Sequence, residues 1–366
     1  MDLEFTEDQE ELRTSVRAVL SRECPIGLVR DVVEKGTGAD GLWQRIVALD
    51  WPALTVPTEA GGVGLGAVEL AVLMEEAGAA ILPAPLFSTL GLFVPVVRAA
   101  GTPSQCSDLL GRVAGGTLVG TVAWDPPGAV DPAGAVASGD DLVLRGVKHY
   151  VTDVDRAGEI VIAVRVDGAL TLVVVPRAEV EAIQTRGLDG TRRMWTVVLD
   201  GVRVGPDRVL GGPGDKSDAW GRAMDEATAA LSMELVGTCS AIFSIALEYA
   251  KVREQFGVKI GSFQAMKHKL ADMFVAVEAA RATAYFAAAA VAEDDPRRSL
   301  AASMAKALAG DCQRRLCQEG IQTLGGIGYT WEHDMHLYVK RAISSGAFLG
   351  DADHHRARVA ALLGVG

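Results

Sequence analysis

Cysteine is scarce in this sequence and never forms a closely spaced pair. The five cysteines are odd in number and scattered along 366 residues: Cys24, Cys106, Cys239, Cys312 and Cys317. That distribution argues against a disulfide framework and against a cysteine-ligated zinc cluster. We therefore expect reduced thiols that act as small core residues, and no metal site.

An excess of positive charge is also missing. The chain has 35 Lys and Arg against 47 Asp and Glu, a formal net charge of −12. Binding to nucleic acid depends on clustered basic residues, so no nucleic-acid partner is expected. The sequence begins with the acidic segment MDLEF, which does not resemble a signal peptide. The alanine-rich run at 284–292 is too short to span a bilayer. We expect a cytoplasmic protein with no membrane partner.

The first part of the chain, residues 1–115, has the periodicity of helices. Thr6 is followed three residues later by Gln9, which is the spacing of a capping box and predicts the start of the first helix. A loop rich in helix breakers follows at 56–64. Further helices are predicted near 42–49, 67–78 and 87–100.

The middle part, residues 116–212, changes to short β-branched runs between turn signals. Asp167-Gly168 and Asp200-Gly201 are two of these signals. Short strands at this spacing predict an antiparallel β-domain. The predicted strands are 117–123, 142–144, 160–166, 170–175 and 195–199.

The last part, residues 213–366, is helical again. Long apolar-periodic segments joined by short connections are typical of a four-helix bundle. The predicted helices are 217–251, 264–293, 298–324, 333–345 and 352–363. The whole chain is therefore predicted to be a multidomain α+β protein, with an N-terminal helical domain, a middle antiparallel β-domain and a C-terminal helical bundle.

Two segments of the C-terminal part carry candidate binding chemistry. Residues 249–264 read YAKVREQFGVKIGSFQ, and residues 322–330 read QTLGGIGYT. A guanidinium such as that of Arg253 can bind phosphate oxygens in a bidentate manner. Glycines such as Gly257 let a ligand or another backbone approach closely. Taken singly, these residues also suit an ordinary helical hairpin with solvated charges.

Taken together, the two segments resemble the acyl-CoA dehydrogenase family. Residues 253–257 match its R-x-x-F-G segment, and residues 322–329 match its Q-x-x-G-G-x-G-y segment. The loop at 56–64 and the strand at 146–152, GVKHYVT, resemble two further signatures. The resemblance covers nearly the whole chain and implies the acyl-CoA dehydrogenase fold.

The resemblance also implies a cofactor and its contacts. FAD would be held at its diphosphate and adenosine half by residues from a neighbouring subunit. These are Arg253, Phe256, Gln322, Gly325 and Gly326. Tyr150, in place of the usual Trp, and Thr152 would lie beside the isoalloxazine. In the reaction that this implies, a carboxylate takes the acyl α-proton and flavin N5 accepts the β-hydride. An electron-transferring flavoprotein is the implied electron acceptor.

Two departures from the family pattern concern the chemistry. The usual T-E-P-x-x-G-S-D segment reads AWDPPGAVD at 123–131, which keeps an acid-Pro pair at Asp125 but loses Gly-Ser. Alignment from Lys340 places Leu349 where the family usually has its catalytic Glu. Asp351, close by, is expected to cap the last helix, and the His354-His355 pair is expected at the surface.

Some family members carry the base on the helix before R-x-x-F-G, which makes Glu226 and Glu234 the candidates here. Glu234 lies in an apolar stretch, where a lone carboxylate would have a raised pKa, and is preferred for that reason. Glu226 could instead be a solvated acid in the first helical turn. Glu234 could instead be a buried acid paired with an Arg.

Two functions remain open. The first is FAD-dependent α,β-dehydrogenation of an acyl-CoA thioester by a homo-oligomer. The second is a non-catalytic partner subunit of an α2β2 acyl-CoA dehydrogenase of the steroid type, which contributes the adenosine-end contacts to FAD. The loss of the usual Glu together with the retention of Arg253 and Gln322 fits the second function.

Overall fold

The computed structural model describes residues 5–37, 39–125, 133–138 and 140–365. They form two compact units, and the boundary between them falls inside one long helix, α7 (Ser217–Val252). Unit 1 contains Met1–Ala39, Ala67–Pro83 and Thr228–Gly366, and unit 2 contains Asp40–Gly66 and Ala84–Ala227. The chain therefore contributes an early helical segment to the same unit as the C-terminal helices. The domain boundaries expected at 115 and 212 stay a prediction.

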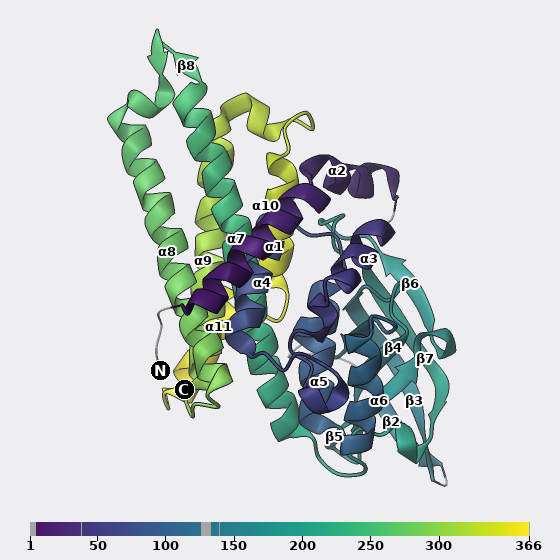
Figure 1. Cartoon of the computed structure of the whole chain (residues 1–366). Coiled ribbons are helices and arrows are strands. Elements are labelled where there is room, and N and C mark those ends of the chain that lie inside the picture. The colour runs from purple at the N-terminus through teal and green to yellow at the C-terminus, as the bar shows by residue number, and fades with distance from the viewer. Residues whose placement is uncertain (1–4, 38, 126–132, 139, 366) are drawn as a thin grey trace. The chain divides into compact units, whose positions relative to one another are not determined.

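Unit 1 is helical, and its long helices lie side by side (Figure 1). These are α7, α8 (Gln264–Ala292) and α9 (Arg298–Leu324). A hairpin of two short strands, β8 (Glu254–Gln255) and β9 (Val258–Lys259), connects α7 to α8. The other helical elements of this unit are α1 (Glu7–Glu23), α2 (Ile26–Lys35), α4 (Ala67–Ala79), η6 (Ile260–Ser262), η7 (Gly325–Tyr329), α10 (Met335–Ala347) and α11 (Ala352–Leu362).

The start of α1 follows from the predicted capping box. Thr6 N–H donates to Gln9 Oε1 at 3.1 Å, and Gln9 N–H donates to Thr6 Oγ1 at 3.2 Å. These two bonds satisfy amides that would otherwise lack partners at a helix N-terminus. The prediction for this helix start is confirmed.

Two glycines allow α4 and α7 to cross in close contact. A Cβ on Gly78 would lie 1.9 Å from the Glu234 carbonyl oxygen, and one on Gly237 would lie 1.9 Å from that of Glu75. Thr238 Oγ1 donates across the crossing to the Gly78 carbonyl at 2.9 Å. Only glycine fits at such a distance, so these positions define how α4 packs against α7.

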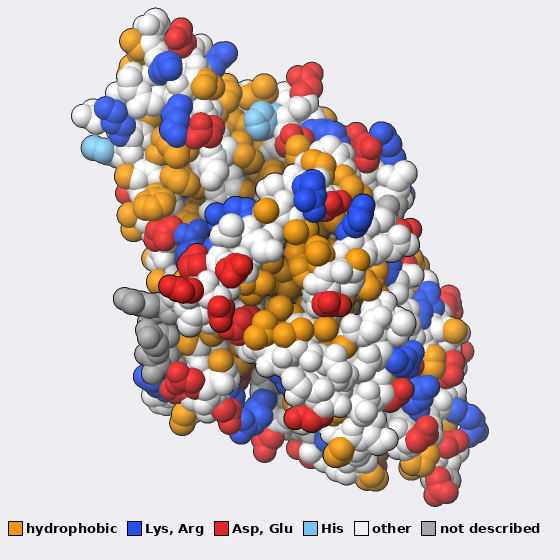
Figure 2. Space-filling view, viewed as in Figure 1, with side chains coloured by type: hydrophobic (Ala, Val, Ile, Leu, Met, Phe, Trp, Pro, Cys, Tyr) orange, Lys and Arg blue, Asp and Glu red, His pale blue; other side chains and the backbone are white. Residues whose placement is uncertain are grey.

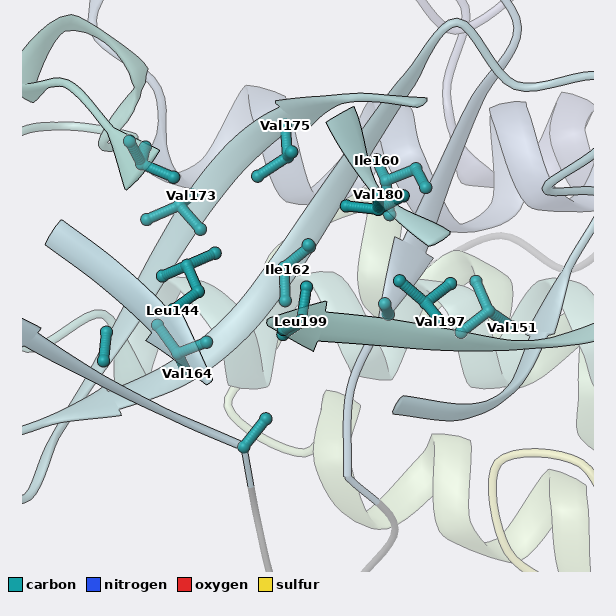
Figure 3. Packing of buried hydrophobic residues seen from close by; sticks show 14 of the residues in the cluster. Leu144, Val151, Ile160, Ile162, Val164, Val173, Val175, Val180, Val197 and Leu199 are labelled. Atoms are coloured by element: carbon teal, nitrogen blue, oxygen red, sulfur yellow. The ribbon is translucent and has the colours of Figure 1, made fainter. Parts of the chain in front are cut away.

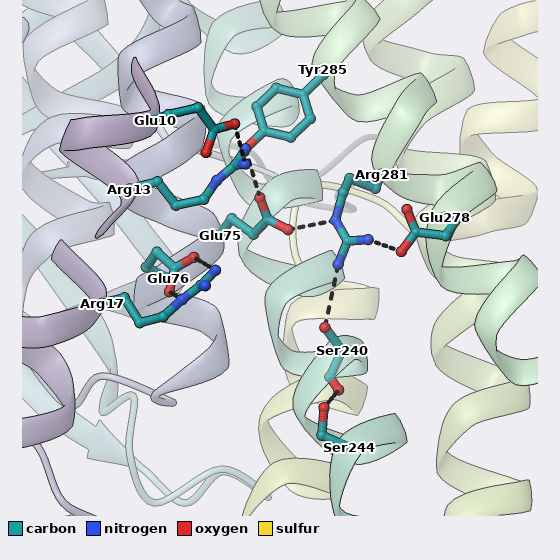
Figure 4. A network of polar contacts seen from close by, with 10 residues as sticks. All are labelled: Glu10, Arg13, Arg17, Glu75, Glu76, Ser240, Ser244, Glu278, Arg281 and Tyr285. Carbon is teal, nitrogen blue, oxygen red and sulfur yellow. Dashed lines mark hydrogen bonds and ion pairs between the residues drawn. The ribbon is translucent and has the colours of Figure 1, made fainter. Parts of the chain in front are cut away.

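A polar network connects four helices of unit 1 around the buried carboxylate of Glu75 (Figure 4). Arg281 Nε and the Tyr285 hydroxyl each donate to it at 2.6 Å. Arg13 of α1 donates to the same hydroxyl at 3.1 Å. Burial is the largest of the factors that raise the pKa of Tyr285, so this hydroxyl stays protonated as a donor. The network attaches α1 to α4 and α8, which are far apart in sequence.

The described residues of unit 2 form a seven-stranded sheet in the order β1-β4-β2-β3-β7-β6, with β5 paired to β4. The pairings are antiparallel except that β1 runs parallel to β4, and β2 pairs parallel with β4 at Gly134 and Arg165. The sheet, predicted to be antiparallel, is therefore mixed. The strands are β1 (Gly120–Ala123), β2 (Gly134–Ser138), β3 (Asp141–Thr152), β4 (Glu159–Val166), β5 (Ala169–Pro176), β6 (Glu181–Thr185) and β7 (Met194–Val204).

Valine, isoleucine and leucine side chains from these strands form the core of unit 2 (Figure 3). Ile160, Ile162 and Val164 alternate along β4 and lie on one face of the sheet. Val161 and Ala163 between them are also buried, so both faces of this part of β4 are covered. The helical elements of unit 2 are α3 (Asp40–Ala48), η1 (Trp51–Ala53), η2 (Thr58–Ala60), the π-helical η3 (Phe87–Phe93), α5 (Val94–Ala100), α6 (Pro103–Ala114), η4 (Arg177–Glu179) and η5 (Pro206–Arg208).

The two predicted turn signals have different outcomes. Asp167 and Gly168 both have positive φ, 48° and 87°, and they close the β4–β5 hairpin as predicted. Asp200-Gly201 does not end a strand, because β7 continues to Val204. Gly201, with φ 72°, lies instead at a β-bulge where β7 pairs with β3. A glycine in a bulge carries the same sequence signal as a glycine in a turn.

In the part of the chain that the structure describes, two helices, α7 and α8, are long and apolar enough to cross a membrane by length and composition. Core helices of soluble proteins meet the same criterion. The most apolar window of α7 is 67% buried within the fold, and that of α8 is 44% buried. The α8 window therefore leaves more of its surface uncovered.

Candidate functional site

The end of β3 carries two of the predicted cofactor residues, Tyr150 and Thr152. Tyr150 lies within a β-bulge and Thr152 follows it, because Lys148 pairs with Val197 and Val151 with Trp195. Tyr150 has a φ of 59° and is 57% exposed, whereas Thr152 is 1% exposed. The bulge thus breaks the alternation that would give the two side chains the same environment.

The Thr152 hydroxyl is a buried polar group without a hydrogen-bond partner among the described residues. Its backbone carbonyl is satisfied, because it accepts the Thr121 hydroxyl at 2.7 Å. An unpartnered buried hydroxyl is costly, and native structures contain few of them. This position therefore suits a ligand with a polar edge, such as a flavin ring.

Lys148 and Asp125 form an ion pair in the same unit. Lys148 is fully buried, and its Nζ lies 2.5 Å from Asp125 Oδ2. Burial lowers the pKa of Lys148, and the Asp125 carboxylate opposes that shift. Asp125 is the acid of the predicted acid-Pro pair, and the rest of that segment, 126–131, lies outside the described residues. The sequence pattern pointed to both residues but not to their contact.

Arg253 and Phe256 lie at the β8–β9 hairpin of unit 1. Phe256 is 93% exposed with a φ of 55°, and its ring meets that of Phe263 edge to face at 6.3 Å between centroids. Arg253 is also exposed. Its carbonyl accepts the Ile260 N–H at 2.8 Å, which closes the hairpin. A large exposed aromatic beside an exposed cation is available to a ligand or to a second subunit.

Gln322, Gly325 and Gly326 lie where α9 ends and η7 begins. Gln322 and Gly326 are exposed. Gly325 has φ 66° and ψ −141°, a conformation that favours glycine. A Cβ added to Gly325 or Gly326 would meet no atom of the described residues within 4 Å. The segment is therefore open to an approaching group.

The candidate base Glu226 lies in unit 2 and is 7% exposed. Arg98 Nη2 donates to Glu226 Oε2, and Arg98 Nη1 donates to the Thr55 carbonyl at 3.2 Å. Because α7 begins at Ser217, Glu226 lies roughly two and a half turns into the helix. The alternative of a solvated first-turn acid is therefore wrong.

The candidate base Glu234 lies in unit 1 and is 2% exposed. Arg341 Nη1 donates to its Oε1 at 2.7 Å, and Arg341 Nη2 donates to the Leu82 carbonyl at 3.2 Å. The expectation of a lone buried carboxylate is thus wrong, and the alternative of a buried acid paired with an Arg describes the structure. The Arg341 cation stabilises the charged form of this carboxylate and so disfavours proton uptake.

Leu349 lies in the turn between α10 and α11 with a φ of 59°. Asp351 caps α11 as predicted, because its Oδ1 accepts the His354 N–H at 2.8 Å. His355 is not at the surface, since it is 2% exposed and its Nε2 lies 3.0 Å from the Leu349 carbonyl. The surface position expected for this histidine is therefore wrong. None of the described residues form a cluster of histidine, cysteine or acidic side chains that could hold a metal ion.

Known proteins share this architecture. Models of the N-terminal and C-terminal domains of acyl-CoA dehydrogenase match residues 6–117 and 219–364. The chain is 30% identical to acyl-CoA dehydrogenase IpdE2 of Mycolicibacterium smegmatis, over 94% of this chain and 96% of that protein. It belongs to the acyl-CoA dehydrogenase family. The predicted fold and the predicted class, oxidoreductases that act on acyl-CoA, are thereby confirmed.

Two other members of the family are also similar. Acyl-CoA dehydrogenase FadE34 of Mycobacterium tuberculosis is 34% identical over 98% of this chain, which spans 48% of FadE34. A structure of a Tcur3481–Tcur3483 steroid acyl-CoA dehydrogenase variant superposes with a TM-score of 0.88 at 29% identity, over 98% of each chain. The roles of the individual site residues stay predictions.

Proposed function

We propose that the chain is a subunit of a FAD-dependent acyl-CoA dehydrogenase that removes an α-proton and a β-hydride from an acyl-CoA thioester. The observation that supports this most directly is the buried Thr152 hydroxyl, which lacks a partner among the described residues and belongs to the segment that resembles the family's isoalloxazine contact. The uncrowded Gly325 and Gly326 add support, because a diphosphate needs close approach to the backbone.

The residues divide into two groups by the part of FAD that each would hold. Thr152 would hydrogen-bond the isoalloxazine, and Tyr150 would present a flat apolar face beside it. Arg253, Phe256, Gln322, Gly325 and Gly326 would hold the diphosphate and adenosine of the FAD of a neighbouring subunit. FAD, when bound, supplies the acceptor for the β-hydride. The residues of this chain orient the ring and exclude water.

A carboxylate must still take the α-proton. The two candidates differ in how easily each could be released from the arginine that binds it. Arg98 is 35% exposed at its side chain, so it can turn toward solvent and leave Glu226 free. Arg341 and Glu234 are both 3% exposed at their side chains, so that pair has no solvent to turn into. The structure therefore favours Glu226, whereas the sequence pattern favoured Glu234.

Spectroscopy of the purified chain tests this proposal. A yellow protein that bleaches when acyl-CoA is added without oxygen supports an enzyme that carries its own flavin. Glu226→Gln should slow bleaching by about 100-fold or more if Glu226 is the base. Glu234→Gln is the matched comparison, with flavin content as the check on folding. Full activity in both variants would exclude both carboxylates as the base.

A second candidate function is that of a non-catalytic partner in a heteromer. Leu349 occupies the place of the usual base, and both alternative carboxylates are engaged by arginines. The similarity to a steroid acyl-CoA dehydrogenase named for two chains supports this candidate. The chain would then hold the adenosine end of FAD bound mainly by a homologous partner, and the acyl group would be a bulky one such as a steroid side chain.

Co-expression distinguishes the two candidates. A chain that is colourless alone and yellow only with a homologous second chain is the partner subunit. Arg253→Met should then release FAD from the complex, with a loss of affinity of about tenfold or more, because one charge-assisted contact to phosphate is removed. Flavin that stays bound in this variant would remove Arg253 from the site.

The surface of unit 1 supports assembly with a homologous subunit. Phe274 and Val275 of α8 are 49% and 65% exposed, and Phe256 is almost fully exposed. Figure 2 shows apolar side chains among basic ones over the part of unit 1 that carries α8 and the hairpin. Exposed apolar side chains in this number favour an interface in which another chain covers them.

We expect a homo- or heterotetramer in the cytoplasm that passes electrons to an electron-transferring flavoprotein. Mass measurement in solution tests the assembly.

A further inference from the structure

The turn that connects α10 to α11 has two consecutive residues with a backbone conformation that favours glycine, and the first of them is a leucine. Leu349 has a φ of 59°, and Gly350 follows with a φ of 97°. A branched side chain at positive φ is strained, because its Cβ crowds the backbone. Such a conformation persists only where the surroundings compensate for the strain. The contacts that this turn makes with α9 and α11 supply that compensation.

Lys306, in the first third of α9, provides the main contact. Its side chain is fully buried in an alanine-rich stretch of the helix. Its Nζ donates to the carbonyl of Gly346 at 2.7 Å and to that of Gly350 at 2.8 Å. One amine thus holds the last turn of α10 and the residue that follows Leu349. The two carbonyls lie on either side of the strained residue.

His355 provides a third contact from α11. Its Nε2 lies 3.0 Å from the Leu349 carbonyl, and since a carbonyl only accepts, Nε2 carries the proton. The carbonyls of Gly346, Leu349 and Gly350 thus each accept a hydrogen bond from a buried side chain. A buried cation is expensive, and an apolar residue would pack in α9 at lower cost. The position of Lys306 is therefore explained by the turn and not by the packing of α9.

We propose that Lys306 is a positioning residue that holds Leu349 in its left-handed conformation and thereby makes Leu349 a specificity-determining residue for the acyl group. The inference rests on the proposed function, in which Leu349 occupies the place of the usual base and would therefore face the acyl group. A side chain that leaves the backbone in a fixed direction presents one apolar surface to the acyl chain. A turn without Lys306 would present that surface in several directions.

Hydrogen exchange of the backbone amides at 347–351 tests the first half of the inference. Lys306→Met should speed this exchange by about tenfold or more, while the amides of α7 at 228–252 keep their wild-type rates. Lys267→Met, the same substitution on an exposed position of α8, should leave both regions unchanged. In a Leu349→Gly background the effect of Lys306→Met should fall to about threefold or less, because glycine needs no support at positive φ.

Acyl selectivity tests the second half. The ratio of kcat/KM for a bulky and a straight-chain acyl-CoA should change by about fivefold or more in Lys306→Met and in Leu349→Gly. The double variant should change it no further than either single variant. If Lys306→Met does not fold, Lys306→Arg, which keeps a buried donor, should restore slow exchange and the wild-type ratio. A purely structural lysine would not alter this ratio.

The outcomes separate the inference from the function on which it rests. Unchanged exchange at 347–351, or faster exchange throughout unit 1, overturns the positioning role. Faster exchange confined to 347–351, together with an unchanged ratio of kcat/KM for the two acyl-CoA substrates, overturns the assignment of Leu349 as a specificity-determining residue. If the wild-type protein oxidises no acyl-CoA alone or with a partner chain, the proposed function and the selectivity assignment both fall. The exchange measurements then still decide whether Lys306 holds the turn.

Discussion

Arg341 of α10 and Glu234 of α7 form an ion pair from which solvent is almost excluded. Arg341 Nη1 lies 2.7 Å from Glu234 Oε1, and each side chain is 3% exposed. Removal of one partner from such a pair leaves an uncompensated buried charge, whereas replacement of both partners with apolar residues is often neutral. The pair therefore offers a clear test of whether its role is structural.

We expect Arg341→Met to lower the free energy of unfolding by about 3–5 kcal/mol, because it removes the Arg341 cation from the buried Glu234 carboxylate. The double variant Glu234→Met with Arg341→Met should recover most of that loss. Urea denaturation of the three proteins measures the difference. Full stability of Arg341→Met would mean that water reaches Glu234, and it would make this carboxylate a stronger candidate for the base.

Gly78 should not tolerate a larger residue. A Cβ there would lie 1.9 Å from the Glu234 carbonyl oxygen, so α4 and α7 would have to move apart. Gly78→Ala is expected to lower the free energy of unfolding by about 3 kcal/mol or more through overpacking. Gly27→Ala in α2 is the matched control, because a Cβ there meets nothing within 4 Å. The control should be neutral or stabilising by about 1 kcal/mol. Equal effects of the two variants would contradict the close crossing.

Much of the fold could be predicted from local patterns, and the misses have local causes. The capping box at Thr6 and the Asp167-Gly168 turn depend on neighbouring residues, so the sequence contains the whole signal. Strands β2 (Gly134–Ser138) and β6 (Glu181–Thr185) were not predicted. Both are short and mostly exposed, so neither has the apolar run that marks a buried strand.

The candidate site was predictable in its residues but not in its contacts. The pairs Arg98–Glu226 and Arg341–Glu234 join residues more than 100 positions apart, 128 and 107 respectively. Such contacts depend on tertiary packing that no local spacing encodes. For Lys306 the sequence does contain a signal, a single cation in the stretch AASMAKALA at 301–309, which is otherwise apolar except for Ser303. Its significance depends on a turn about 40 residues later, at Gly346 and Gly350.

Thr152 provides a test of the flavin site that is independent of catalysis. Thr152→Val removes the hydroxyl and keeps the shape of the side chain. Without flavin, this variant should be as stable as the wild type or more stable, because an unpartnered buried polar group is removed. With flavin, the affinity should fall by about fivefold to tenfold, the value of one hydrogen bond.

Titration with FAD, followed by fluorescence, measures this affinity, and Thr152→Ser is the control that keeps the hydroxyl. Lower stability of Thr152→Val without any change in flavin affinity would show that the hydroxyl bonds within the protein. Thr152 would then leave the list of cofactor residues.

Lys306 should make the stability of the protein depend on pH in a defined window. Burial lowers the pKa of Lys306 from 10.5 to about 7, and the nearby Asp351 carboxylate opposes that shift. Burial also lowers the pKa of His355 to about 4, so this neighbour stays neutral throughout the window. Between pH 7 and 10.5 the unfolded chain therefore binds more protons than the folded protein.

The free energy of unfolding should rise with pH across that window by up to about 1.4 kcal/mol per unit, and the full penalty for burying the charge is present below pH 7. Lys306→Met removes this pH dependence and also two hydrogen bonds. The free energy of unfolding of the wild type minus that of the variant should therefore increase from pH 7 to pH 10, and the lost hydrogen bonds add a constant to this difference at every pH. Urea denaturation at several pH values measures the slope, and subtraction cancels the groups that both proteins share. Lys267→Met should reproduce the wild-type slope. A difference that does not vary with pH would mean that Lys306 keeps its charge in the fold, stabilised there by the two carbonyls and Asp351.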